Sequence, residues 1–123
     1  MLAAALLACA IQAPDHNPWR LSEQQLCLAQ YIVREADANN IEPEILLAIA
    51  WAESNLRPGV TNPTTHDYGM MQINYRAWHA SMGYGSKREF ARAMRNPIKN
   101  VAAAIHVVNT YRDRKWCRGR KIF

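Results

Sequence analysis

The sequence has no apolar run long enough to cross a membrane. Its longest strongly apolar run, Leu2 to Ile11, is far shorter than the roughly 18 to 20 residues that a membrane-spanning helix needs. It also lacks internal repeats and low-complexity tracts, and its 123 residues suffice for one domain but not for two. Half of the residues are apolar and a fifth are charged, as in globular proteins. These features exclude a solenoid, an integral membrane protein and a multidomain enzyme.

Basic residues are scarce in the first part of the chain and abundant in the last. Residues 1–86 carry four Lys or Arg side chains against eight Asp or Glu, a net charge of −4, whereas residues 87–123 carry eleven against two, a net charge of +9. A region this basic attracts an anionic partner such as a nucleic acid, an anionic lipid or a cell-wall polymer. The alternative is a solvated basic end without a dedicated partner, and residues 118–123 are assigned as a basic tail.

Residues 1–13 have the pattern of an export segment without a basic start. An apolar stretch ends in Ala8-Cys9-Ala10, the small-x-small pattern that precedes signal-peptide cleavage, and the residues before Cys9 also resemble a lipoprotein acylation box. No Lys or Arg precedes Arg20, so the alternatives are a misassigned start and a buried helix. We expect a signal peptide or a lipoprotein-type segment, and a protein of the periplasm or cell envelope.

Only three cysteines are present, and export would reduce the number that can form a disulfide from three to two. If Cys9 is removed with a signal peptide or acylated, Cys27 and Cys117 remain as an even pair in an oxidising compartment. We therefore predict a disulfide between Cys27 and Cys117, which would close a loop of roughly 90 residues and contribute about 4 kcal/mol in the chain-entropy model. The alternative is a pair of buried free thiols in a cytosolic protein.

No segment shows the alternation typical of a half-buried strand, so we predict an all-α chain in a single helical domain. Ser22 is a suitable N-cap for a first helix that ends near Ala38. Pro43 stands in the first turn of a second helix, over 44–54. The Pro, Gly and Asn residues between 55 and 68 predict a long loop.

Three more helices are expected in the second half of the chain. They are predicted over 70–80, over 87–94 and, after an Asn96-Pro97 start, to about Tyr111. The last helix is expected to bury one apolar face, made of Ile98, Val101, Ala102, Ile105 and Val108.

Glu53 lies near the end of the most hydrophobic predicted helix. Helical spacing places Leu46, Ile49 and Ala50 on the same face as Glu53. Such a surface solvates a carboxylate poorly and favours the protonated form that a general acid requires. The alternative is an exposed glutamate just beyond the buried turns, and position alone leaves both open.

Three motifs follow one another around Glu53. They are residues 48–54 (AIAWAES), 69–74 (GMMQIN) and 96–104 (NPIKNVAAA). With them the sequence resembles the lysozyme-like lytic transglycosylases, the SLT family. In that family a Glu-Ser pair closes a buried helix, a Gly-Leu-Met-Gln segment lines the saccharide cleft, and an Asn-initiated helix packs behind both. The resemblance covers about residues 27–108 and implies a mainly α, lysozyme-like domain over 20–117.

The resemblance implies that Glu53 is the catalytic residue of a peptidoglycan lytic transglycosylase. Such an enzyme needs no cofactor. It cleaves the β-1,4 bond between N-acetylmuramic acid and N-acetylglucosamine in glycan strands and leaves 1,6-anhydromuramoyl ends. Ser54 would orient Glu53, Gln72 would hold an acetamido or hydroxyl group, and Gly69 would let the backbone approach the sugar. The motif implies three further substrate-binding residues, Tyr68, Met70 and Asn74.

The chain is similar in size to the small specialised transglycosylases that serve secretion, conjugation or phage machines, in which a cysteine often stands where Cys27 is found. We therefore expect a monomer that opens the wall locally, with a component of such a machine as a second partner. The sequence departs from the family in having Met70 for the usual Leu and in lacking a Tyr-Asn-Ala-Gly segment whose tyrosine contacts the catalytic glutamate. Candidates to replace that tyrosine are Tyr68, Tyr75 and Tyr111. An inactive wall-binding relative is an alternative.

Asp67 is a possible second carboxylate. If it faced the sugar ring it would support the cationic centre or position a water, as in lysozyme-type hydrolases that use two carboxylates. The alternative is an aspartate that caps the helix predicted from residue 70.

The remaining polar residues point to no other chemistry. The four histidines and the distant cysteines show no metal-ligand spacing, so no metal site is predicted. A remote alternative is a basic helical module that binds nucleic acid through the Arg, Lys and aromatic residues between 111 and 121. Export and the absence of a known DNA-binding motif argue against it, so no nucleic-acid partner is expected.

Overall fold

The computed structural model describes residues 20–113. In this part of the chain it has five helices and three short strands: α2 (Glu23–Ala38), α3 (Pro43–Ser54), β1 (Thr61–Asn62), β2 (Asp67–Tyr68), β3 (Ile73–Asn74), α4 (Tyr75–Trp78), α5 (Lys87–Met94) and α6 (Pro97–Asp113). The predicted mainly helical fold is confirmed. None of the described helices is long and apolar enough to span a membrane. The predicted export segment, Cys9, Cys117 and the tail over 118–123 lie outside the described residues.

Helix α2 begins at the residue expected from its cap. The Ser22 hydroxyl accepts a hydrogen bond from the Gln25 amide at 3.1 Å, and the Gln25 side-chain oxygen accepts one from the Ser22 amide at 2.8 Å. This reciprocal pair satisfies two N–H groups that have no partner inside the helix. Helix α3 likewise begins with Pro43 in its first turn, as predicted.

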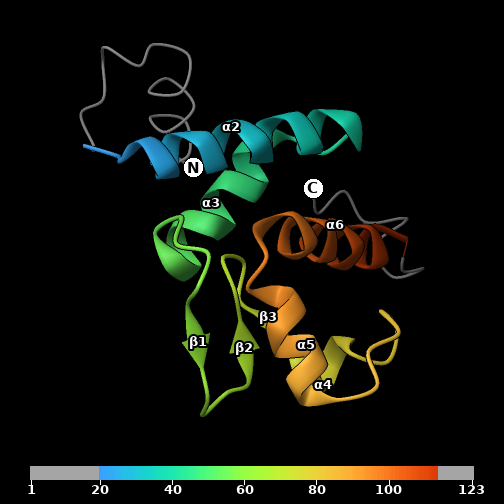
Figure 1. The fold of residues 1–123 in the computed structure, drawn as a ribbon. Coiled ribbons are helices and arrows are strands. Elements are labelled where there is room, and N and C mark those ends of the chain that lie inside the picture. The colour runs from blue at the N-terminus through green and yellow to red at the C-terminus, as the bar shows by residue number, and fades with distance from the viewer. Residues whose placement is uncertain (1–19, 114–123) are drawn as a thin grey trace.

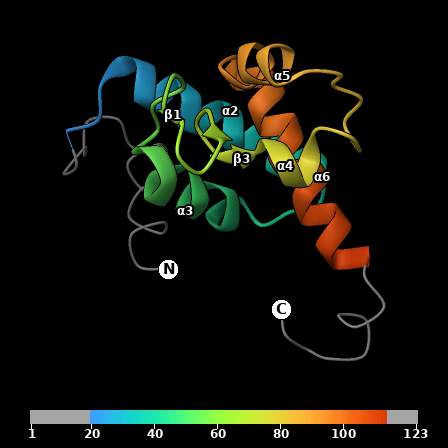
Figure 2. The same cartoon turned by 90° about the horizontal axis from the view of Figure 1, so that it is seen from below.

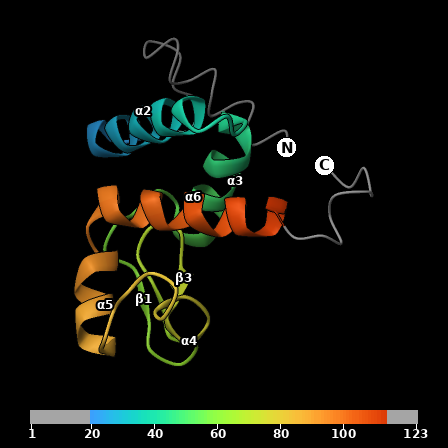
Figure 3. The same cartoon turned by 90° about the vertical axis from the view of Figure 1, so that its right-hand side faces the viewer.

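Helix α3 lies between α2 and the strands (Figure 1). Its residues Leu46, Leu47 and Ala50 are fully buried, which is why this helix is apolar over most of its circumference. Helix α6 lies between α2 on one side and α5 on the other (Figure 3). From below, the strands lie between α3 and the pair α4 and α5 (Figure 2).

The predicted helix over 70–80 is wrong for most of its length. The chain instead forms an antiparallel sheet in the order β1-β2-β3, and only Tyr75–Trp78 is helical, with Asn74 as its N-cap. Two residues with positive φ, Gly69 at 83° and Gln72 at 53°, break any helix in this segment. The strands are only two residues long, too short to show an alternating pattern.

Helices α5 and α6 confirm the two predictions for the end of the chain, but the buried face of α6 differs from the expected one. Ile98 is 60% exposed and Ala102 is also exposed, whereas Asn100 is fully buried. The apolar residues that α6 does bury are Val101, Ala103, Ala104 and Ile105. The buried face of α6 is rotated toward Asn100, because the Asn100 side chain forms hydrogen bonds with the backbone of the motif segment.

Candidate active site

Glu53 stands in the last turn of α3 with its side chain exposed. Leu46 and Ala50 are buried in the core, and Ile49 is half-buried. The expected desolvation of Glu53 by these three residues is therefore wrong, because they pack inward while the carboxylate reaches solvent. Ile49 lies one helical turn before Glu53 on the same face of α3.

Ile49 lines a cavity of about 160 Å³ together with the motif segment. The motif contributes Met71, Gln72, Ile73 and Asn74, and the far wall is formed by Trp78 of α4 and by Ala104, Val107 and Val108 of α6. The structure thus brings the middle of α3, the second motif and the helix begun by the third motif around one cavity. Glu53 does not line this cavity; it stands one turn beyond Ile49 along α3.

The end of α3 is held by a left-handed turn directly after Glu53 and Ser54. Asn55 and Leu56 have φ values of 53° and 59°, and the Leu56 amide donates to the Ala50 carbonyl at 3.2 Å. Leu56 is almost fully buried, which keeps this turn in place. The Gln25 side chain of α2 also donates to the Asn55 carbonyl at 2.9 Å. Local turn geometry and a tertiary contact together set the position of Glu53.

Ser54 does not hold Glu53 in the way the resemblance implies. Its buried hydroxyl donates to the Ala50 carbonyl at 3.1 Å and accepts from the Arg57 amide at 3.2 Å. The Arg57 side chain also donates to the Ser54 carbonyl at 3.0 Å. Ser54 therefore stabilises the backbone of the turn and acts on Glu53 only through it.

Gly69 and Asn100 form the junction between the motif segment and α6. Asn100 is fully buried; its amide nitrogen donates to the carbonyls of Tyr68 and Met94, both at 3.0 Å, and its oxygen accepts from the Met71 amide at 2.8 Å. A Cβ at Gly69 would overlap the Asn100 amide and the Met94 carbonyl. The glycine thus makes room for Asn100, and the expected close approach of its backbone to sugar stays a prediction.

Gln72 uses its side-chain nitrogen within the fold. It donates to the carbonyls of Val60 and Gly69 at 3.1 and 2.9 Å; the first bond ties the motif to the segment before β1, and the second lies within the motif. The side chain is half-buried and lines the cavity. Its oxygen is the atom that remains for a ligand, because no hydrogen bond within residues 20–113 uses it.

Asp67 is part of the sheet and does not cap a helix, so the capping alternative is wrong. Its carboxylate accepts from the Thr65 hydroxyl at 2.6 Å and from the Asn74 amide at 2.9 Å. Asn74 also donates to the Thr65 carbonyl and accepts from the Ala77 amide, both at 3.0 Å. Asp67 and Asn74, which pair across β2 and β3, thus stabilise the hairpin and the start of α4.

Two of the expected substrate-binding residues lie elsewhere. Met70 is fully buried in the core, so the predicted contact with substrate does not agree with its position. Tyr68 is 5% exposed and packs edge-on against Phe90 of α5, and it does not line the motif cavity. Among the other tyrosine candidates, Tyr75 stacks on His79 and Tyr111 packs edge-on against Trp78.

Asn100 belongs to the third motif, but the sequence predicted no role for it. An asparagine within a run of alanines and valines is a signal that it is buried and fully bonded, since a polar group in a core needs partners. His66 was also unassigned. It has a φ of 63°, and its pKa is lowered by burial and by the nearby cations Lys87 and Arg76, against the opposite effect of Asp67. In the described part of the chain no three His, Cys, Asp or Glu side chains are grouped as a metal site requires.

A comparison with known protein families gives a match. A family model described as transglycosylase SLT domain matches residues 30–115, which is more than half of the chain. No match was found among curated proteins, and none among solved structures. The matched range contains all three motifs and every residue of the cavity described above.

Proposed function

The chain belongs to the transglycosylase SLT domain family, and from this we propose that it is an exported lytic transglycosylase that uses Glu53 as its acid and base. The substrate is the glycan strand of peptidoglycan. The bond cleaved is the β-1,4 bond between N-acetylmuramic acid and N-acetylglucosamine, and the product carries a 1,6-anhydromuramoyl end. The proposed biological role is local opening of the wall for a secretion, conjugation or phage machine.

One geometric observation carries the proposal. Glu53 stands one turn beyond Ile49 on the same face of α3, and Ile49 lines the cavity that the motif Met71–Asn74 also lines. A single carboxylate on this face of α3 suits chemistry in which the substrate itself supplies the second group. The cavity offers apolar walls for a sugar face and the Gln72 side-chain oxygen as an acceptor.

The first step would be proton donation. With its carboxyl protonated, Glu53 gives the proton to the glycosidic oxygen as the bond to the muramoyl C1 breaks. The 2-acetamido oxygen of the same sugar then stabilises the positive centre at C1, as in other substrate-assisted glycosidases. The ordered turn at Asn55 and Leu56 fixes the backbone that carries Glu53, which favours a constant distance to the oxygen.

The second step would return the proton. Glu53, now ionised, takes the proton from the C6 hydroxyl of the muramoyl sugar, and the C6 oxygen attacks C1 to close the 1,6-anhydro ring. This restores the protonated carboxyl. The hydroxyl belongs to the same sugar, so its effective concentration is high and ring closure competes well with water.

The proposal is tested by digesting purified sacculi with the wild-type chain and with Glu53→Gln and reading the products by mass spectrometry. We expect anhydromuropeptides from the wild type and a loss of at least about a hundredfold in rate for the variant, as for removal of a general acid. The matched control is Glu42→Gln. Glu42 is exposed at the other end of α3 and its side chain makes no capping bond, so this variant should keep full activity. Equal activity of all three proteins would refute the role of Glu53.

A lysozyme-type hydrolase that uses Glu53 and Asp67 is a second candidate. The Asp67 carboxylate, however, already accepts hydrogen bonds from the side chains of Thr65 and Asn74, which favours a structural role for it. The digest separates the two, because a hydrolase yields reducing ends. If Asp67→Asn keeps its turnover and its anhydro products, Asp67 has no catalytic role.

A further inference from the structure

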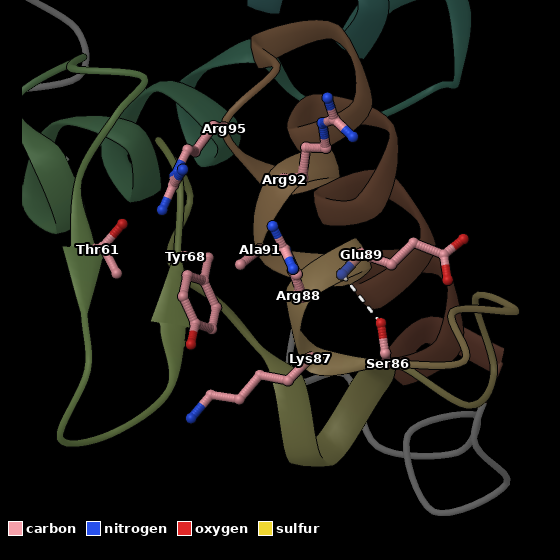
Figure 4. Close-up of a pocket in the computed structure, with 9 residues that line it drawn as sticks. All are labelled: Thr61, Tyr68, Ser86, Lys87, Arg88, Glu89, Ala91, Arg92 and Arg95. Carbon is pink, nitrogen blue, oxygen red and sulfur yellow. Dashed lines mark hydrogen bonds between the residues drawn. The ribbon is translucent and has the colours of Figure 1, made fainter.

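A second recess, a groove of about 980 Å³, lies between the β1–β2 hairpin and α5. Thr61 and Tyr68 line it on the hairpin side. On the other side lie four cations, Lys87, Arg88 and Arg92 of α5 and Arg95 at its C-cap, and Figure 4 shows three of them around the Tyr68 ring. We call this recess the basic groove. None of these residues lines the motif cavity.

The positive charge of the basic groove is not neutralised within the described chain. All four cations are exposed, and across residues 20–113 none of their side chains forms an ion pair or donates a hydrogen bond. Glu89 is the acidic residue in the lining, but its carboxylate accepts from the Gly85 amide at 3.3 Å and points away from Tyr68 (Figure 4). The positive charge of Lys87 also acts on His66. Burial lowers the pKa of His66, and the charges of Lys87 and Arg76 lower it further.

The basic groove and the motif cavity are neighbours across one pair of strands. Tyr68 lines the groove, Ile73 lines the cavity, and the two residues are register partners in β2 and β3. Directly paired residues in antiparallel strands have Cα atoms about 5 Å apart. The two recesses therefore border the same pair of strands.

The dimensions of the groove suit a short peptide. From Lys87 to Arg95 the helix rises by about 12 Å, since each residue adds 1.5 Å. A peptide of roughly four or five residues spans about 13 to 17 Å when extended. Peptidoglycan carries peptides of this length on each muramoyl lactyl group, and these peptides end in and are substituted by carboxylates. Arginine binds carboxylates with paired, charge-assisted hydrogen bonds.

We propose that the basic groove binds the carboxylates of the peptide stem attached to the muramoyl sugar that occupies the motif cavity. This assignment rests on the proposed function, because it takes peptidoglycan as the substrate. It makes α5 a specificity element: strands that carry peptides are held better than strands without them.

The test measures binding by the full chain with Glu53→Gln, so that no cleavage is needed. The probes are intact sacculi, glycan strands freed of peptides by an amidase, and a DNA oligonucleotide. The groove variant adds Arg88→Gln and Arg95→Gln. The matched control adds Arg34→Gln and Lys99→Gln, which remove the same charge from exposed positions outside the groove. Circular dichroism and thermal unfolding check that all variants are folded.

We expect the groove variant to bind intact sacculi about tenfold more weakly, the effect of two lost charge-assisted contacts, while the control stays within about twofold. On peptide-free strands all proteins should bind alike. A free stem tetrapeptide should compete with sacculi, and the same peptide with amidated carboxylates should not.

Four results would overturn the assignment. They are equal losses for both double variants, an equal loss on peptide-free strands, a groove-dependent affinity for the oligonucleotide with unchanged sacculus binding, and no sacculus binding at all. Failure of the proposed function is distinct: a wild-type chain that cleaves nothing can still show groove-dependent binding of peptide-bearing strands.

Discussion

At the scale of single residues, the Asn100 amide holds the motif segment against α6. Three backbone groups, the carbonyls of Tyr68 and Met94 and the amide of Met71, find their partner in this one buried side chain. A buried polar group that loses its partner costs about 1 to 3 kcal/mol. The second motif therefore depends on the third for its conformation.

We expect Asn100→Ala to lower the free energy of unfolding by about 3 kcal/mol, because three buried groups lose their partner. Gly69→Ala should also destabilise by about 2 kcal/mol, since its Cβ would overlap Asn100 and its φ is 83°. In the double variant the smaller residue 100 relieves part of the overlap. The double variant should therefore lose less free energy of unfolding than the sum of the two single losses. Urea denaturation of the four proteins measures this cycle, and strict additivity would contradict the proposed packing.

His66 makes stability depend on pH. Burial, Lys87 and Arg76 lower the pKa of folded His66 below the 6.5 of an ordinary histidine, and Asp67 opposes them. As the pH falls below 6.5 the unfolded chain binds a proton first, so the folded state loses stability until the pH passes the lower folded pKa. His66→Asn removes this dependence and tolerates the positive φ. Unfolding measured from pH 8 to pH 5 should show the wild type losing stability relative to the variant; parallel curves would contradict this.

At the scale of elements, the start of α2 and the end of α3 are joined by one side chain. Gln25 completes the capping box with Ser22 through its oxygen, and through its nitrogen it donates to the Asn55 carbonyl just after Glu53. The first interaction is local, and the second spans 30 positions of the sequence. Helix α2 thus supports the turn that carries the proposed catalytic residue.

Two substitutions separate these effects. Ser22→Ala should cost about 1 kcal/mol of stability through the lost cap and leave the rate of glycan cleavage unchanged. Gln25→Ala should cost about 2 kcal/mol and also reduce that rate, because the turn after Glu53 loses a support. Thermal unfolding and the sacculus digest give the two readouts. Identical kinetics for both variants would mean that the Asn55 contact does not position Glu53.

At the scale of the whole molecule, the predicted disulfide would join α2 to the end of the chain. Cys27 is exposed on α2, and Cys117 lies outside the described residues. A free thiol at the exposed position would react readily with iodoacetamide, whereas a paired one would not. For protein exported to an oxidising compartment we expect both cysteines to be alkylated only after reduction. Alkylation of Cys27 without reduction would exclude the pairing.

The motif cavity and the basic groove lie in different parts of the molecule. The motif cavity lies among α3, α4, α6 and the strand β3, and the basic groove lies between the hairpin and α5. The charge excess that begins at Lys87 is thus, in part, a structured surface and not only a tail. Its position one strand pair from the cavity could not be deduced from composition.

Much of this protein follows from local sequence. The caps at Ser22 and Asn96, the proline at Pro43 and the apolar periodicity predicted four helices near their observed bounds. These signals work because a helix is stabilised by bonds and contacts within a few residues. The order of the three motifs likewise pointed to the family that the comparison confirms.

What the folded arrangement alone settles are the contacts between distant segments. The exposure of Glu53, the sheet in place of a helix at Ile73, and the bonds of Asn100 across 29 to 32 positions all depend on how α3, α6 and the strands meet. A two-residue strand has no periodicity to detect, and a side chain such as Ser54 can bond its own backbone or a neighbour with equal local ease. Packing against the core chooses between such options, because a buried polar group must find a partner within the one geometry that fills the interior.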